Sequence, residues 1–298
     1  MLNGEEIPLW PGTAPGSQGL VIEECVEERS PDTQAFTDRA ITGISRPRLA
    51  VFHPEKPSGL AILVVPGGGY QRIVWDSAIK AAQWLTGLGM TACVLLYRLP
   101  SEGHQHGENV PLQDAQRALR LMRAHAAAWN VDASRIGAMG FSAGGHVVSS
   151  LATGFRRTVY EARDASDSLS ARPDFVVLAY PVISMRADIA DPGSREKLIG
   201  QEELADETIR LLSSDECVTA ETPESFIVLA DDDELVPPAN GVRYYLACHR
   251  AGVKAELHVY RNGGHGFGVR RDRGPVVAWM QQCEAWLRHA SWLIDKDE

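Results

Sequence analysis

The sequence has few cysteines, and their spacing excludes several classes of protein. The 298 residues contain five, at positions 25, 93, 217, 248 and 283. No two of them form a C-x-x-C pair, so a zinc ribbon and a thioredoxin-type redox motif are both excluded. An odd and scattered set is typical of reduced thiols in a cytosolic protein rather than of a disulfide framework.

The chain also lacks an excess of basic residues and lacks long apolar runs. Lys and Arg number 29 against 39 Asp and Glu, a formal net charge of −10. This balance repels phosphate backbones and anionic lipid, so neither nucleic acid nor a membrane surface is expected as a partner. The apolar runs, such as residues 60–65 and 175–180, are too short to span a bilayer.

The first residues, Met1 to Glu6, are polar and acidic and do not form a signal peptide. We therefore expect a cytoplasmic protein, with a secreted mature form whose leader has been removed as the alternative.

The sequence has neither internal repeats nor low-complexity tracts, and its composition is that of a globular protein, with 44% hydrophobic and 23% charged residues. From about residue 48, short apolar runs alternate with segments of helical periodicity. The expected strands are residues 49–52, 60–65, 91–97, 135–140, 175–180, 226–230 and 256–260. The expected helices are residues 77–88, 112–129, 143–153, 238–251 and 275–289. Continuous apolar strands that alternate with helices predict an α/β fold, with a mostly parallel central sheet covered by helices on both faces.

Two segments interrupt this alternation. Residues 1–47 contain several prolines and glycines and are expected to form an irregular lead-in with edge strands. Residues 184–223 are polar and charged, with one plausible helix near 203–212, and we expect a small insertion between sheet strands rather than a full lid domain. The length permits two small domains or one large one, and this pattern favours a single domain over residues 1–298.

The motif that carries chemistry is GFSAGGH at residues 140–146, which contains G-x-S-x-G. The motif alone is weak, but here it ends an apolar strand and begins a helix. In that context the serine occupies a sharp strand-to-helix turn and acts as a nucleophile, so we expect Ser142 to be catalytic. A glycine-rich connection without chemistry is the alternative.

A nucleophilic serine requires a base, because an alcohol is a poor nucleophile at neutral pH. The histidines that follow Ser142 are His146, His249, His258, His265 and His289. Only His265 lies in a glycine-rich loop directly after a strand, where a catalytic histidine is expected. The others fall within helical or strand patterns.

A carboxylate should orient this histidine, and in the expected fold it lies between the serine and the histidine in chain order. The strand at residues 226–230 ends in Asp231, Asp232 and Asp233. Periodicity does not choose among them. The two that do not face the histidine are expected to belong to a solvated acidic turn.

The oxyanion formed during acyl transfer requires backbone N–H donors. Ala143, which follows the nucleophile, is expected to supply one. The glycine loop PGGGY at residues 66–70 is expected to supply the other. A phosphate-binding loop is excluded, because neither a Lys-Ser/Thr pair nor G-x-G-x-x-G spacing is present.

Several other residues have patterns that are less specific. His104 and His106 could ligate a metal, but no further ligands complete a site, and a solvated loop is favoured. No metal and no cofactor is expected. Asp114 and Arg117 suggest helix capping and surface charge. Trp10 and Trp75 suggest packing in the core or at its rim, a role more common than that of a sugar platform.

These motifs resemble those of the α/β-hydrolase superfamily, and within it those of carbohydrate acetylesterases such as acetylxylan esterases and bifunctional acetyl/feruloyl esterases. The matching stretches are LWPGTAPG (9–16), PGGGY (66–70), YRL (97–99), PLQDAQRA (111–118), GFSAGGH (140–146), YPVI (180–183), SREKLIG (194–200), DELVP (233–237) and GHGFG (264–268).

The resemblance implies specific roles. The family carboxylate belongs to a D-x-x-V-P motif, which falls on Asp233, and the family PGGGY loop implies Gly68 as the oxyanion donor, with Gly69 next. The chain departs from the family at residues 222–226, where similar proteins have a second proline and a threonine. This difference concerns the entry of a strand and leaves the implied triad intact.

The expected function is hydrolysis of acetyl esters of small acylated carbohydrates by a Ser-His-Asp serine esterase. A feruloyl esterase, an arylformamidase or a small peptidase could use the same triad. A non-catalytic binding module of the same fold is the alternative from another class. The oligomeric state is left open.

Overall fold

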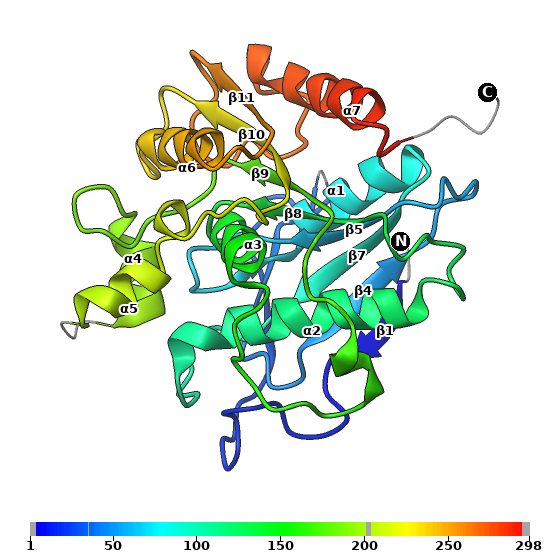
Figure 1. Cartoon of the computed structure of the whole chain (residues 1–298), viewed down its shortest axis with the longest axis vertical. Helices are drawn as coiled ribbons and strands as arrows, with labels where there is room; N and C mark the ends of the chain where they lie inside the picture. Colours follow the sequence, from blue (N-terminus) through cyan, green and yellow to red (C-terminus); the bar gives the residue numbers. More distant parts are fainter. Residues whose placement is uncertain (1–3, 35, 201–203, 294–298) are drawn as a thin grey trace.

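A computed structural model of the chain describes residues 4–34, 36–200 and 204–293. Its centre is an eight-stranded sheet with the order β1-β4-β7-β5-β8-β9-β10-β11 (Figure 1). The strands, in that order, are Glu5–Pro8, Arg48–Phe52, Thr91–Leu96, Ala61–Val65, Ile136–Phe141, Phe175–Ala179, Glu224–Ala230 and Ala255–Tyr260.

The sheet is mostly parallel. β4 pairs antiparallel with β1 and with β7, and every other pair of neighbours is parallel. All residues of β5, β7, β8 and β9 are buried, as expected for strands covered on both faces. The predicted fold class is confirmed.

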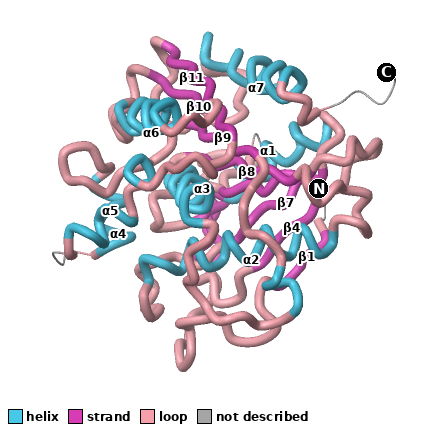
Figure 2. Tube along the Cα trace, in the orientation of Figure 1, coloured by secondary structure: helices cyan, strands magenta, loops and turns pink. Residues whose placement is uncertain are grey.

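Helices cover both faces of the sheet (Figure 2). α2 (Val110–His125), α3 (Ala143–Gly154) and α6 (Ala239–Arg250) pack into one apolar cluster. α1 (Trp75–Gly87) and α7 (Trp279–His289) pack into the cluster on the other face. Each was predicted, with ends that differ by a few residues. The closing helix begins with a 3₁₀ turn at Gly274–Ala278, where an α-helix was expected.

The lead-in is irregular apart from short strands, and edge strands were expected in it. β1 forms one edge of the main sheet. β2 (Cys25–Glu28), β3 (Arg39–Thr42) and β6 (Ile73–Val74) form a separate antiparallel sheet of three strands.

The insertion follows β9 and contains two short helices, α4 (Pro192–Ile199) and α5 (Asp206–Leu211). α5 lies within the helix predicted near residues 203–212, although residue 203 lies outside the described part of the chain. α4 was not predicted. The single-domain organisation over residues 1–298 stays a prediction.

The expectation for Asp114 and Arg117 was wrong. Asp114 is fully buried and accepts hydrogen bonds from the indole Nε1 of Trp10, at 2.9 Å, and from the backbone and guanidinium of Arg98. Arg117 is 2% exposed and donates from Nε to the carbonyl of Leu9 at 2.7 Å. Both charged side chains therefore attach the lead-in to α2. They are not the exposed charges at a helix start that were expected.

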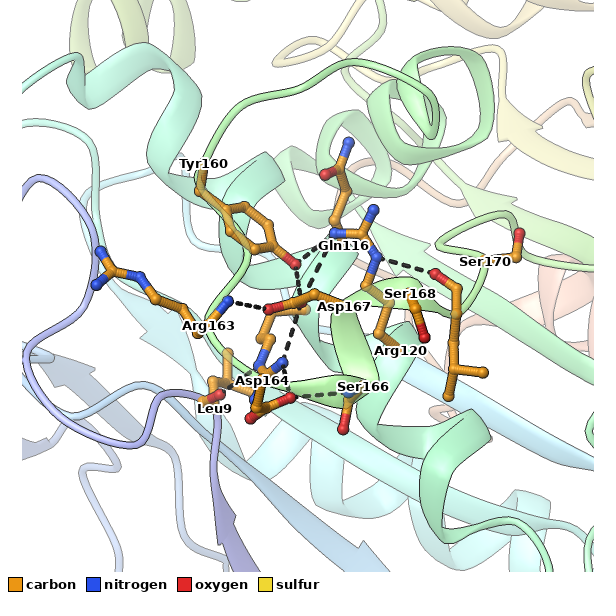
Figure 3. A network of polar contacts seen from close by, with 12 residues as sticks. Leu9, Gln116, Arg120, Tyr160, Arg163, Asp164, Ser166, Asp167, Ser168 and Ser170 are labelled. Carbon is orange, nitrogen blue, oxygen red and sulfur yellow. Dashed lines mark hydrogen bonds and ion pairs between the residues drawn. The ribbon is translucent and has the colours of Figure 1, made fainter.

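The same network continues into the loop that follows α3, which Figure 3 shows from close by. Arg117 forms ion pairs with Asp164 and Asp167. The Tyr160 hydroxyl donates to Asp167 at 2.7 Å, and the Tyr160 ring packs edge-on against Trp10. Trp10 is 6% exposed, so its predicted packing role is confirmed. Trp75, half-buried at the start of α1, packs against both apolar clusters.

All five cysteines are free. In the part of the chain that the structure describes, none of the helices has the length and apolar content needed to cross a membrane.

Candidate active site

Ser142 occupies a strained turn between β8 and α3. Its backbone has φ 55° and ψ −122°, a conformation that is unfavourable for a residue with a side chain. The surroundings hold it there, because its carbonyl accepts hydrogen bonds from Gly145 N at 2.8 Å and Val182 N at 3.1 Å. Strain that is stabilised in this way is typical of a functional residue.

The glycines around the serine are required by close backbone contacts. A Cβ atom on Gly144 would lie 2.2 Å from the carbonyl oxygen of Val65 at the end of β5. A Cβ atom on Gly140 would lie 2.3 Å from the carbonyl oxygen of Gly144. α3 can therefore approach the sheet closely only because both positions are glycine.

The loops after β8, β10 and β11 bring Ser142, Asp233 and His265 together at the carboxyl edge of the sheet. Nε2 of His265 lies 2.8 Å from Oγ of Ser142, and Nδ1 lies 2.8 Å from Oδ2 of Asp233. An ionised carboxylate only accepts hydrogen bonds, so Nδ1 carries the proton and Nε2 is free to accept one from the serine hydroxyl.

Asp233 is itself fixed in position. Its Oδ1 accepts hydrogen bonds from the backbone N–H groups of Leu235 and Val236, at 3.0 and 2.9 Å, and its side chain is 2% exposed. Of the three neighbouring aspartates, it is therefore the one that contacts the histidine, as the family motif implied.

Asp232 has a role that the sequence did not indicate. It lies exposed in a turn, as expected, and in addition its Oδ1 accepts hydrogen bonds from Gly263 N and Gly264 N, both at 2.8 Å. These bonds hold the pKa of the Asp232 carboxyl below its usual range, with the bond from Gly264 the largest cause. Asp232 thus anchors the loop that carries His265. Asp231 is exposed, as expected.

The glycine loop after β5 lies beside the serine. Gly68 has φ 133° and Gly69 has φ 63°, and a Cβ atom on Gly68 would lie 2.0 Å from the carbonyl oxygen of Arg72. Among the described residues, no carbonyl accepts a hydrogen bond from the N–H groups of Gly68 and Gly69. Ala143 is the first residue of α3, where N–H groups have no partner within the helix. These three predicted donors are therefore available to an oxyanion.

Sequence reasoning missed a buried hydrogen-bond chain behind this loop. The Tyr70 hydroxyl lies 2.6 Å from Nδ1 of His146, and Nε2 of His146 lies 2.7 Å from the carbonyl oxygen of Leu212. The carbonyl accepts only, so His146 donates from Nε2 and accepts from Tyr70 at Nδ1. Burial lowers the pKa of His146 to about 4, so the ring is neutral. Both side chains belong to motifs named above, but their distance apart in sequence concealed the contact.

Tyr180 was also not assigned a role. Its ring packs edge-on against His265, with centroids 5.0 Å apart, and against Phe267 at 4.5 Å. The imidazole is thereby held from the side as well as through Asp233.

A cavity of about 480 Å³ lies beside Ser142 and His265. Ser142, His265 and the glycine loop line it together with Phe141, Tyr180, Leu235 and residues at the start of α4. Its size lies in the range of small-molecule sites. The insertion therefore reaches the site.

The two histidines that could ligate a metal, His104 and His106, do not line this cavity. His104 is 7% exposed, and its Nδ1 lies 3.0 Å from Oγ of Ser17, so the expected solvated loop was wrong for this residue. His106 has an exposed side chain. Over residues 4–34, 36–200 and 204–293, no group of three or more His, Cys, Asp or Glu side chains could hold a metal ion.

Comparison with solved structures supports the fold. The acetyl ester-xyloside bifunctional hydrolase of Caldicellulosiruptor lactoaceticus is 33% identical, with a TM-score of 0.79 over 98% of each chain. The carboxylesterase Cest-2923 of Lactobacillus plantarum has the same fold at 23% identity, with a TM-score of 0.70 over 91% of this chain and 100% of that one.

Two curated proteins are similar in sequence. An acetylxylan esterase of Xylanibacter ruminicola is 38% identical over 226 residues, 74% of this chain and 44% of that protein. Endo-1,4-beta-xylanase B of Butyrivibrio fibrisolvens is 34% identical over 75% of this chain and 35% of that protein. This chain thus spans less than half the length of either. The family model BD-FAE matches residues 49–246, from within β4 to within α6, a range that includes Ser142 and Asp233. The chain therefore belongs to the BD-FAE family of α/β-hydrolases.

Proposed function

We propose that this protein is a serine ester hydrolase that removes acetyl groups from acylated carbohydrates. The observation that carries the proposal is the hydrogen-bond chain from Ser142 through His265 to Asp233, beside glycine N–H groups for which the described residues provide no carbonyl acceptor. This arrangement provides a nucleophile, a base and an oxyanion site beside one cavity, with a carboxylate that orients the base.

In the first half of the reaction, Oγ of Ser142 attacks the ester carbonyl carbon while Nε2 of His265 takes the hydroxyl proton. Asp233 stabilises the imidazolium that forms. The N–H groups of Ala143 and Gly68, with Gly69 next to them, stabilise the negative charge on the former carbonyl oxygen.

The tetrahedral intermediate then collapses. His265 returns its proton to the departing alcohol oxygen, and an acetyl ester forms on Ser142. In the second half, a water molecule gives a proton to His265 and attacks the acetyl carbon, which releases acetate and restores the serine hydroxyl. No step in this scheme uses a metal or an organic cofactor.

The substrate class rests on similarity. The relatives are named as an acetylxylan esterase and as an acetyl ester-xyloside bifunctional hydrolase, which favours a small acetylated sugar as the substrate. Hydrolysis rates for acetylated xylo-oligosaccharide, acetyl-glucose, methyl ferulate and formylkynurenine would test this choice. The acetylated sugars are expected to be the best substrates, and a preference for ferulate or formylkynurenine would reject it.

The chemical mechanism has its own test. Ser142→Ala should abolish turnover of p-nitrophenyl acetate while the circular dichroism spectrum and melting temperature remain close to those of the wild type. A fluorophosphonate probe should label the wild type and not the variant. Retained turnover in Ser142→Ala would reject the mechanism, and an unlabelled and inactive wild type would favour a non-catalytic binding module.

A further inference from the structure

One wall of the cavity beside Ser142 is polar and has no part in the chemistry described above. Asp191 and Ser194 contribute to it from the start of α4, and Gln71 contributes from the loop after β5. All three line the same cavity as Ser142 and His265.

These three side chains lie close to one another around Gly193 and Gly69. The distances are given from the point that a Cβ atom would occupy on each glycine. A Cβ atom on Gly193 would lie 3.7 Å from Oδ2 of Asp191 and 3.8 Å from Nε2 of Gln71. A Cβ atom on Gly69 would lie 3.8 Å from Nε2 of Gln71 and 3.9 Å from Oγ of Ser194. A carboxylate, an amide and a hydroxyl therefore gather next to the proposed oxyanion loop.

Asp191 and Ser194 each have a side-chain oxygen that the rest of the described protein does not bind. Asp191 is 5% exposed and Ser194 is 1% exposed. Oδ2 of Asp191 accepts a hydrogen bond from Ser194 N at 2.7 Å. Within the described ranges, neither Oδ1 of Asp191 nor Oγ of Ser194 has a hydrogen-bond partner in the protein. Both residues line the cavity, so these two atoms can form hydrogen bonds with a molecule bound there.

We propose that Asp191, Ser194 and Gln71 form a subsite that binds free hydroxyl groups of the sugar ring in the ester substrate. The carboxylate accepts a hydrogen bond from a sugar hydroxyl, and the Gln71 amide donates one to a sugar oxygen. The Ser194 hydroxyl can do either. The inference rests on the proposed function, because it assigns the polar wall to the sugar of the same ester that Ser142 attacks.

The test compares two esters with similar rings. Methyl 2-O-acetyl-xyloside carries free ring hydroxyls, and cyclohexyl acetate carries none. The variant Asp191→Asn keeps an oxygen that can accept from Ser194 N, so α4 retains its cap, but it removes the charge. We expect kcat/KM for the xyloside to fall about tenfold relative to that for cyclohexyl acetate, mainly through KM, because the charge-assisted hydrogen bond is lost.

Ser194→Ala gives an independent measurement and should shift the same ratio in the same direction. Asp188→Asn is the matched control, because Asp188 lies in the same insertion, is exposed, pairs with Arg243 and does not line the cavity. Its ratio should equal that of the wild type. The inference is rejected if Asp191→Asn and Ser194→Ala leave the ratio at the wild-type value, or if both esters lose the same factor.

Failure of the subsite and failure of the proposed function give different results. If the wild type hydrolyses cyclohexyl acetate and depends on Ser142, but the ratio does not respond to Asp191, then the esterase stands and the subsite is rejected. If Ser142→Ala retains hydrolysis of both esters, the esterase mechanism itself is rejected, and with it the subsite.

Discussion

The hydroxyl of Tyr70 donates a hydrogen bond of 2.6 Å to Nδ1 of His146, and both side chains are buried. Tyr70 follows the glycines of the proposed oxyanion loop, and His146 lies one helical turn beyond Ser142. The bond therefore joins the two segments that supply the proposed oxyanion donors. The second bond of His146, to the carbonyl of Leu212, extends the connection into the insertion.

Replacement of Tyr70 by Phe should reduce both stability and turnover. The change leaves Nδ1 of His146 buried without a donor, which costs about 1–3 kcal/mol in the free energy of unfolding. kcat for p-nitrophenyl acetate should fall because the loop that carries Gly68 and Gly69 loses its hydrogen bond to His146. Urea unfolding and steady-state kinetics measure the two effects. Tyr245→Phe, at a half-buried tyrosine on α6, is the control, and an equal loss there would contradict the prediction.

His146 should make the protein less stable as the pH falls. Its folded pKa of about 4 lies below the ordinary 6.5, so the unfolded chain takes up the proton first. Stability is then lost between pH 6.5 and 4, by about 2 kcal/mol on going from pH 7 to pH 5. Urea unfolding at the two pH values should show that this loss is smaller by about this amount in His146→Gln. Equal pH dependence in the wild type and the variant would contradict a neutral buried His146 with a lowered pKa.

The neighbouring aspartates should respond differently to substitution. Asp233→Asn should reduce kcat by about 10³-fold or more, because the imidazole loses the partner that fixes its tautomer and stabilises its charge. Asp232→Asn keeps an oxygen that can accept from Gly263 N and Gly264 N, so a much smaller loss is expected. The comparison uses p-nitrophenyl acetate at saturating concentration. Equal losses in the two variants would contradict the separate roles assigned to Asp233 and Asp232.

Asp114→Ala should strongly destabilise the fold without altering the cavity that contains Ser142. It leaves Arg98, which is fully buried, without its carboxylate, and loss of one partner of a buried pair costs about 3–5 kcal/mol. The measurement is the free energy of unfolding in urea. Asp188→Ala removes an exposed partner of Arg243 and should change that energy by less than about 1 kcal/mol. A similar effect for both aspartates would contradict the structural role of Asp114.

The sequence predicted the central part of the fold well, because the central strands are short apolar runs whose burial on both faces leaves a clear pattern. β1 and β2 carried no such signal, since most of their residues are exposed and their pairing depends on partners far along the chain. α4 was missed because its eight residues lack an apolar face that repeats with helical spacing.

The site residues likewise divide into those that local sequence context predicts and those that it does not. Ser142, His265 and Ala143 followed from local context, because strand ends and a helix start define them. Asp233 required the family motif, since three adjacent aspartates have the same local pattern. The buried partners of Asp114 are Arg98 and Trp10. Trp10 lies 104 residues away along the chain, and no local sequence pattern reveals such a contact.

The hydrogen bond from His146 to the carbonyl of Leu212 limits how freely the insertion can be exchanged between related enzymes. The start of α4 can vary with the alcohol to be recognised, because it contributes side chains to the cavity wall. The backbone at residue 212 cannot vary in the same way, because its carbonyl oxygen fixes His146, which accepts the hydrogen bond from Tyr70. Transplanted insertions should therefore transfer substrate preference with full reaction rate only when they return a carbonyl oxygen to this point.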